Sequence, residues 1–247
     1  MKETKRKIQL LNDGLDGTCY ALSSGVDEII YAGGEFATAG KINAKNIARY
    51  NSIQNRWTAL GEGVDDICKA IAVDRQNGDV YVGGQFIKAG NVEANHVAKW
   101  TGRSWEALGT GLPDDCNAIL IDENQNVYVG GNFTQIGDLV VNYIVKWNPK
   151  TKSWSALGDG LPGACNALAF DGNGNLYAGG EIAVSKWDSA TNTWKTLADQ
   201  FVLYMSCHAI AIDSTSNTVY AGGNFGVKQY DEVNDRWIGS VILRMIS

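Results

Sequence analysis

The sequence predicts an all-β fold: a five-bladed β-propeller with four antiparallel strands per blade, closed into a ring. Three observations support this prediction. The tetrapeptide Tyr-Ala/Val-Gly-Gly occurs five times, at intervals of 43 to 50 residues. A cysteine precedes it in every copy, and two aromatic columns follow it in every copy. Sequence repeats of 40 to 50 residues that contain four short strands are typical of propeller blades.

The 247 residues are a length that one all-β domain commonly reaches. With 29 glycines and 3 prolines, the composition favours short strands and tight turns over helices. We therefore expect residues 1–247 to form a single domain. Its repeat units are predicted at residues 19–67, 68–115, 116–164, 165–206 and 207–247, with residues 7–18 contributing to closure.

The second copy shows how each unit divides into strands. It has apolar runs at residues 68–73, 80–83, 97–100 and 105–108. The sequence Arg-Gln-Asn-Gly at 75–78 separates the first two runs and is typical of a hairpin turn. We therefore predict four strands in each unit.

The first strand of each unit is predicted to lie nearest the axis of the ring. One of its faces carries small residues, while the tryptophans occur in strands three and four. The small residues are Cys19, Ala21 and Ser23; Cys68, Ala70 and Ala72; Cys116 and Ala118; Cys165, Ala167 and Ala169; and Cys207, Ala209 and Ala211. Sheets that radiate from an axis converge inside, so close packing requires small side chains there.

Ring closure has two candidates at the sequence level. Residues 7–11 align with the fourth strand of a blade, and so do residues 237–241. We expect one of them to pair beside the other terminus and cover an edge that would otherwise be open to aggregation.

Three motifs in the chain resemble kelch-like repeats. They are the Gly-Gly-x-Phe turn at 33–36, the Val-Ala-Lys-Trp strand at 97–100 and the Trp-x-Ala-Leu-Gly-x-Gly strand at 105–111. The chain is most similar to repeats of bacterial surface proteins and of fungal cell-polarity marker ectodomains, from about residue 7 to residue 241. The resemblance implies a propeller. Such propellers mostly serve as binding or interaction modules, and a minority carry enzyme sites.

The charge of the chain excludes some partners. A formal net charge of −6 argues against sequence-independent binding to nucleic acid or to an anionic membrane. Residues 1–7 are basic, but too few apolar residues follow them for a signal peptide. We expect a cytoplasmic protein, or an extracellular one if an export signal has been removed.

The five cysteines occupy one position, the start of the innermost strand. Packed sheets lie about 10 Å apart, which is beyond the Cα separation of about 7 Å that a disulfide allows. A fivefold thiol ring also suits no tetrahedral metal site, and two histidines are too few for a histidine cluster. We expect free, buried cysteines and no metal or cofactor.

Polar residues recur at three positions that the topology places on one face of the ring. They follow each cysteine, follow each Gly-Gly pair, or precede the first strand as paired acids. These predicted collar residues are Tyr20, Lys69, Asn117, Asn166, His208, Glu35, Gln85, Asn132, Glu181, Asn224, Asp65, Asp66, Asp114 and Asp115. Such a collar could hydrogen-bond a sugar or a cationic peptide. In the alternative interpretation, the acids are simply solvated and the amides satisfy the Gly-Gly turn.

Loop length differs between the repeats. The connection from strand two to strand three is long at 37–46, 87–96 and 134–143, and nearly absent after Glu181 and Asn224. We expect a raised rim on the collar face, a common place for binding residues, although tolerated insertion would look the same. The Asp-rich segments 122–126 and 171–175 lack the later glycine and glutamate of a calcium loop, and we interpret them as turns on the opposite face.

These observations favour a non-enzymatic module that presents a polar, acidic loop face to a protein or cationic peptide. A lectin-like propeller with repeated sugar pockets is the alternative, and a glycan-active enzyme is the second alternative. Glycosidases need two acids in unlike environments, whereas the acids here recur from copy to copy.

Overall fold

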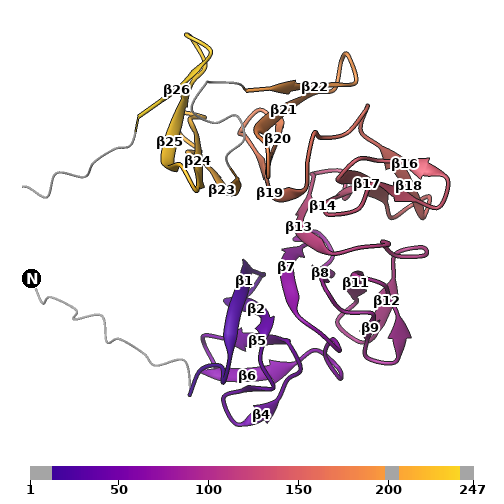
Figure 1. The fold of residues 1–247 in the computed structure, drawn as a ribbon. Coiled ribbons are helices and arrows are strands. Elements are labelled where there is room, and N and C mark those ends of the chain that lie inside the picture. Colours follow the sequence, from indigo (N-terminus) through magenta and orange to yellow (C-terminus); the bar gives the residue numbers. More distant parts are fainter. Residues whose placement is uncertain (1–12, 198–205, 240–247) are drawn as a thin grey trace, which may run out of the picture.

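The computed structural model describes residues 13–197 and 206–239, and these residues form strands and turns without a helix. Five four-stranded antiparallel sheets, named units 1 to 5, follow one another along the chain. Figure 1 shows them arranged in an arc, with one strand of each unit on the inner side. The described chain is therefore a propeller-type domain.

In each unit the four strands pair in chain order. Unit 1 contains β1 (Thr18–Ser24), β2 (Ile29–Glu35), β5 (Ile47–Asn51) and β6 (Arg56–Ala59). Unit 2 contains β7 (Cys68–Val73), β8 (Val80–Gly84), β11 (Val97–Trp100) and β12 (Trp105–Ala107). Unit 3 contains β13 (Cys116–Ile121), β14 (Val127–Gly131), β17 (Ile144–Asn148) and β18 (Ser153–Ala156). Unit 4 contains β19 (Cys165–Phe170), β20 (Leu176–Gly180), β21 (Val184–Asp188) and β22 (Thr193–Thr196). Unit 5 contains β23 (Cys207–Ile212), β24 (Val219–Gly223), β25 (Gly226–Asp231) and β26 (Arg236–Ile238).

Units 1 to 3 each carry an additional two-stranded hairpin, named the rim hairpin, at the predicted long loops. The three hairpins pair β3 (Thr38–Ala39) with β4 (Ile42–Asn43), β9 (Lys88–Ala89) with β10 (Val92–Glu93), and β15 (Gln135–Ile136) with β16 (Leu139–Val140). The four strands predicted for the second copy agree with the structure to within one residue at each end.

The two aromatic columns form cross-strand pairs between the third and fourth strands of every unit. Trp147 lies opposite Trp154 in register, with ring centroids 4.8 Å apart and planes tilted by 55°. The equivalent pairs, with centroids 5.1 to 5.2 Å apart, are Tyr50 with Trp57, Trp100 with Trp105, Trp187 with Trp194, and Tyr230 with Trp237. Tilted aromatic pairs contribute more than their buried area alone, so this column stabilises the outer half of each sheet.

Adjacent units pack through one repeated contact on the inner side. In units 1 to 4, the first glycine of the Gly-Gly pair lies against the cysteine of the next unit. A Cβ added at Gly83 would overlap the sulfur of Cys116, and one added at Gly179 would lie 2.6 Å from the sulfur of Cys207. Gly33 faces Cys68 and Gly130 faces Cys165 in the same way. Small residues are therefore required near the axis, as the sequence pattern predicts.

The outer edges of the units are joined by a second contact, from a fourth-strand tryptophan to the backbone of the preceding unit. The indole nitrogens of Trp105, Trp194 and Trp237 donate hydrogen bonds of 3.0, 2.9 and 2.8 Å to the carbonyls of Leu60, Leu157 and Leu197. The buried indole nitrogen of Trp154 has no hydrogen-bond partner among the described residues. The interface between units 2 and 3 therefore lacks this outer bond.

All five cysteine thiols are free. Burial raises the pKa of Cys68 to about 12 and that of Cys207 to about 11. Cys68, Cys116, Cys165 and Cys207 are buried, as expected, but Cys19 is exposed, which corrects the expectation for the first copy. The reason is that each of the other four cysteines packs against a glycine of the preceding unit, and among the described residues no unit precedes unit 1.

The described arc is open between unit 1 and unit 5. Figure 1 shows β1 and β23 on either side of the opening. One predicted closing segment, residues 7–11, and the end of the other, residues 240 and 241, lie outside the described residues. The inner position of the first strands agrees with the sequence, whereas a five-bladed ring that is closed stays a prediction.

The glycine that receives each cysteine should not tolerate a methyl group. We expect Gly83→Ala to destabilise the protein by about 1–3 kcal/mol, because the added Cβ overlaps Cys116 in a packed interface. Urea denaturation measures this change. Gly239→Ala is the matched control, since no atom of the described residues lies within 4 Å of a Cβ added there. Equal stability of the two variants would contradict the contact, and a double-mutant cycle with Cys116→Ala would show whether the sulfur is the cause.

Candidate functional site

The collar begins with a β-bulge at the same place in all five units. The register of each first strand shifts between the cysteine and the alanine two residues later. The residue left unpaired by the bulge is the one that follows the cysteine. These residues are Tyr20, Lys69, Asn117, Asn166 and His208. Bulges redirect a side chain out of the ladder, which explains why this position supplies collar side chains.

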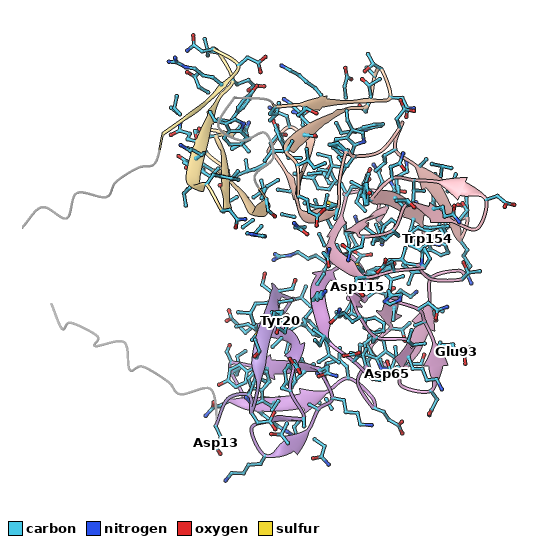
Figure 2. The ribbon with its side chains drawn as sticks, in the orientation of Figure 1. Asp13, Tyr20, Asp65, Glu93, Asp115 and Trp154 are labelled. Carbon is cyan, nitrogen blue, oxygen red and sulfur yellow. The ribbon has the colours of Figure 1, made fainter. Side chains whose placement is uncertain are left out.

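Asp115 is the centre of the polar network between units 2 and 3. Its Oδ2 atom accepts hydrogen bonds from Lys69 Nζ at 2.9 Å and from Gln85 Nε2 at 2.7 Å. His96 Nδ1 lies 3.8 Å from the other carboxylate oxygen. Figure 2 shows Asp115 beside the inner strands. Burial opposes ionisation of Asp115, but the hydrogen bonds from Lys69 and Gln85 outweigh it, so the pKa of the carboxyl lies below its usual value.

Two asparagines form separate hydrogen bonds between the inner strands of units 3 to 5. Asn117 Nδ2 donates to Asn132 Oδ1 at 3.0 Å and lies 3.4 Å from the carbonyl of Cys165. Asn166 Nδ2 donates to the carbonyl of Cys207 at 3.3 Å. The bulge side chains of units 3 and 4 therefore bond to the backbone of the next unit.

The collar residues of unit 5 pair within their own unit. His208 Nε2 lies 3.1 Å from Asn224 Oδ1. Both residues are exposed, as is Tyr20 at the other end of the arc. Figure 2 shows Tyr20 beside the opening. The structure thus connects the predicted collar through units 2 to 4 and leaves its two ends apart.

The acids before the first strands have different roles, although the pairs look alike in sequence. Asp65 Oδ1 accepts hydrogen bonds from the backbone amides of Ile87 and Lys88, at 2.9 and 2.8 Å, and so holds the rim hairpin of unit 2. Asp16 does the same for the rim hairpin of unit 1, through the amides of Ala37 and Thr38. The hydrogen bonds from Thr38 lower the pKa of Asp16.

The remaining predicted acids are exposed. Asp66 and Asp114 each accept a hydrogen bond of 2.7 Å from the backbone amide of the next residue. Glu35 and Glu181 make no side-chain hydrogen bond with the described residues. The solvated interpretation therefore holds for part of the acidic set, and these four carboxylates face solvent.

A pocket of about 480 Å³ opens on the collar face between units 1 and 2. Its charged lining residues are Asp16, Glu35, Asp65 and Lys45, and Phe36 and Asn46 also line it. Three carboxylates and one ammonium give the lining a net negative charge. The pocket therefore brings together three features that lie apart in the sequence: the end of the second strand, the acids that precede the first strands, and the loop of the rim hairpin.

Three residues of this face belong to none of the motifs identified in the sequence. Asn46 accepts a hydrogen bond from the amide of Phe36 and donates one to the carbonyl of Val64, at 3.1 Å in both cases. His96 reaches Asp115, and Lys45 lines the pocket. Asn46 and His96 have positive φ angles of 60° and 68°, just before the third strand. An asparagine at such a position is a sequence signal for a turn that aims side chains inward.

The Asp-rich segments lie at the hairpin turns of units 3 and 4, as predicted. Asp122 Oδ1 accepts hydrogen bonds from the amides of Asn124 and Asn126, and Asp171 repeats this pattern with Asn173 and Asn175. The Oδ1 atoms of Asp122 and Asp171 therefore accept hydrogen bonds from the backbone of their own turns. Within residues 13–197 and 206–239, no group of three potential metal-ligating side chains is present. The same residues contain no helix that is long and apolar enough to cross a membrane.

Comparison with known proteins supports a propeller-type domain. The family described as the Rax2 C-terminal beta propeller domain matches residues 105–206. No curated protein sequence matches the chain. The structure is similar to the extracellular domain of a putative hybrid two-component system from B. thetaiotaomicron, with a TM-score of 0.60 and 15% identity, over 83% of this chain and 26% of that chain. The extracellular domain described as a putative one-component system from the same organism matches with a TM-score of 0.60 and 14% identity, over the same shares.

This chain therefore spans about a quarter of the length of these solved structures. At this identity the likeness concerns the fold alone. Propeller domains commonly serve as binding or interaction modules, and nothing in the comparisons identifies a partner or a reaction for this chain.

Asp115 should stabilise the folded protein in a pH-dependent way. Its folded-state pKa lies below the ordinary value of 3.8, so its carboxylate stabilises the fold at pH values above 3.8, and this contribution is lost as the pH falls through the folded pKa. We expect Asp115→Asn to cost about 1 kcal/mol at pH 7, because Lys69 keeps its charge without its partner. The difference from wild type should shrink below about pH 4.

Urea denaturation between pH 3 and pH 7 measures this effect. Asp114→Asn is the neighbouring control, since the amide oxygen can still accept the hydrogen bond from the backbone of Asp115. A stability difference for Asp115→Asn that does not change with pH would contradict the role of its charge.

Proposed function

We propose that the protein is a non-enzymatic binding module, a five-bladed propeller closed into a ring, whose collar face takes up a cationic segment of a protein or peptide. The observation that carries this proposal is the acidic pocket between units 1 and 2, with the rim hairpins beside it. Its lining places Asp16, Glu35 and Asp65 around one opening of about 480 Å³. Complementary charge favours encounter with a basic partner and its orientation.

The rim hairpins support this proposal because they are held rigidly. In unit 1, Gly40 donates a backbone hydrogen bond to Gly14, and Asp16 donates one to Thr38. In unit 2, Gly90 and Asp65 donate the equivalent bonds to Gly63 and Lys88. The buried residues Ala39 and Ala89 anchor the two hairpins to the core. A partner would meet a preformed surface and would lose less binding free energy to ordering of loops.

The acids with free carboxylate oxygens lie on this face beside acids that are used internally. All five of these acids are exposed, but Asp16 and Asp65 hold the hairpins, whereas Glu35, Asp66 and Asp114 do not. The face therefore carries acids that stabilise the hairpins beside acids that do not. This division allows the charges of the second set to be tested without disrupting the hairpins.

The lectin-like alternative receives less support from the tryptophans. Sugar pockets commonly use an exposed aromatic face, but Trp105 and Trp237 are buried and donate their indole hydrogens to the backbone of the preceding unit. These side chains serve packing between units. For this reason we propose a peptide or protein partner over a carbohydrate.

We further propose a reducing, cytoplasmic location on the basis of the five free thiols, four of which are buried. The solved structures that resemble the chain are extracellular domains, so the location is a proposal for this chain and is independent of the binding face.

The binding proposal predicts a localised charge effect. We expect the triple variant Glu35→Gln, Asp66→Asn, Asp114→Asn to bind a fluorescein-labelled octa-arginine peptide about tenfold more weakly than wild type, because three exposed charges of modest individual effect are removed. Fluorescence anisotropy at low and at physiological salt measures this change, and salt should weaken wild-type binding more than variant binding.

The matched control is Asp27→Asn, Glu28→Gln, Glu123→Gln, which removes three exposed charges at the first hairpin turns on the opposite face. This control should bind the peptide within about twofold of wild type, as expected for sites beyond a Debye length. An equal loss in both triple variants would mean that only net charge matters, and no binding by the wild-type protein would refute the proposed cationic partner.

A further inference from the structure

The two ends of the arc carry complementary halves of the contact that joins the units. At four interfaces the first glycine of a Gly-Gly pair receives the cysteine of the next unit. In unit 5 this glycine is Gly222, and a Cβ added there would meet no atom of residues 13–197 and 206–239 within 4 Å. In unit 1 the corresponding cysteine is Cys19, which is exposed. Unit 5 therefore has an unfilled space beside Gly222, which we name the Gly222 notch. Unit 1 has an exposed cysteine of the kind that fills this space at the other four interfaces.

A second side chain extends this complementarity. At three of the four interfaces, the residue three positions after the cysteine also packs against the glycine of the preceding unit; the exception is Leu168 of unit 4, because the atoms nearest a Cβ built at Gly130 belong to Cys165 and Ala118. The Cδ1 atoms of Ile71, Ile119 and Ile210 lie 2.9 to 3.1 Å from the Cβ positions built at those glycines. The equivalent residue in unit 1 is Leu22, and 70% of its surface is exposed. Cys19 and Leu22 together form what we name the β1 ridge.

The apolar surface around these ends is exposed as well. Near the β1 ridge, Tyr20 is 54% and Ile30 is 38% exposed, and on unit 5 Val227 is 55% exposed. Residues at the equivalent positions inside the arc are more buried, for example Val80 on β8 and Val127 on β14. An exposed apolar patch of this kind marks a contact surface.

We infer that the β1 ridge packs into the Gly222 notch of the same chain and that this fifth Cys-on-Gly contact closes the ring. The occupant of the notch is the chain's own first unit because the two halves match in type and register. Their tether within one chain gives them a high effective concentration. Two copies paired end to end would instead make a ring of ten units, more than the four to eight that propellers typically contain.

To close the ring, neighbouring units must rotate against each other. The inner contacts between units are kept, and the outer edges of two neighbouring units move apart. Three interfaces resist this movement through the indole-to-carbonyl hydrogen bonds of Trp105, Trp194 and Trp237. The interface between units 2 and 3 has no such bond, because the Trp154 indole nitrogen lacks a partner among the described residues. Figure 2 shows Trp154 in the outer part of unit 3.

The same interface contains a cavity of about 130 Å³, lined on the unit 2 side by Glu106 and Leu108 and on the unit 3 side by Trp147 and Lys152. A missing hydrogen bond and a cavity at one outer edge are the features expected of the interface that moves. The closing rotation is therefore placed between units 2 and 3.

The first test compares the melting temperatures of Gly222→Ala, Gly83→Ala and Gly239→Ala in the full chain. In the closed ring, the added methyl group at Gly222 meets the β1 ridge, so Gly222→Ala lowers the melting temperature about as much as Gly83→Ala. If Gly222→Ala behaves like Gly239→Ala, the notch is empty in solution and the inference is overturned.

The second test identifies which chain fills the notch. The Cβ positions built at the four occupied glycines lie 2.9 to 3.2 Å from the Cβ of the facing cysteine, a little closer than in a disulfide. Mild oxidation of Gly222→Cys should therefore link the introduced thiol to Cys19 within one monomer, as shown by mass mapping. Gly33→Cys, which faces Cys68, is the matched control for the geometry.

A disulfide-linked dimer of Gly222→Cys would overturn the intramolecular contact in favour of a second copy. A free Cys19 thiol that reacts with maleimide as fast as in the unfolded protein would also overturn it. Both experiments read out ring closure in the absence of peptide, so their failure is distinguishable from a failure of the proposed cationic partner.

Discussion

The architecture depends on the contact in which a cysteine at the start of one unit lies against a glycine of the unit before it. This contact sets how closely the inner strands approach, because a Cβ added at the glycine would overlap the sulfur of the facing cysteine. Because it recurs with the same register at four interfaces, each unit is added to the arc in the same way. The outer tryptophan-to-leucine hydrogen bonds then hold the far edge at three of these interfaces.

The candidate binding face follows from the same inner strand. The bulge directly after each cysteine turns the next side chain out of the ladder, and the second glycine of the Gly-Gly pair allows the backbone of the bulged strand to approach. Collar side chains are therefore supplied at a fixed position in every unit, whatever their identity. Lys69 forms an ion pair with Asp115, Asn117 and Asn166 bond to the next unit, and Tyr20 is left exposed at the open end.

The face is uneven because only units 1 to 3 carry rim hairpins. Two of these hairpins are held by carboxylates, Asp16 and Asp65, and the pocket lies between those two units. In unit 3, Pro113 stands three residues before the cysteine, where those units have an aspartate, and the acid at Asp115 is free to bind Lys69 and Gln85 instead. An acid three residues before the cysteine therefore holds a rim hairpin, whereas an acid one residue before the cysteine bonds to the preceding unit.

The period, the four strands of each unit, the two aromatic columns and the placement of the cysteines on the inner strand could all be predicted from the amino-acid sequence. These features follow from local patterns, namely the alternation of side chains along a strand and the residues that turns require. Three features emerge only in the folded structure: which acid holds a hairpin, the bulge at the residue after each cysteine, and the Trp154 indole that lacks a hydrogen-bond partner among the described residues. These three features depend on how one sheet is rotated against the next. That rotation is set by packing between residues about 45 positions apart, so it produces no local pattern in the sequence.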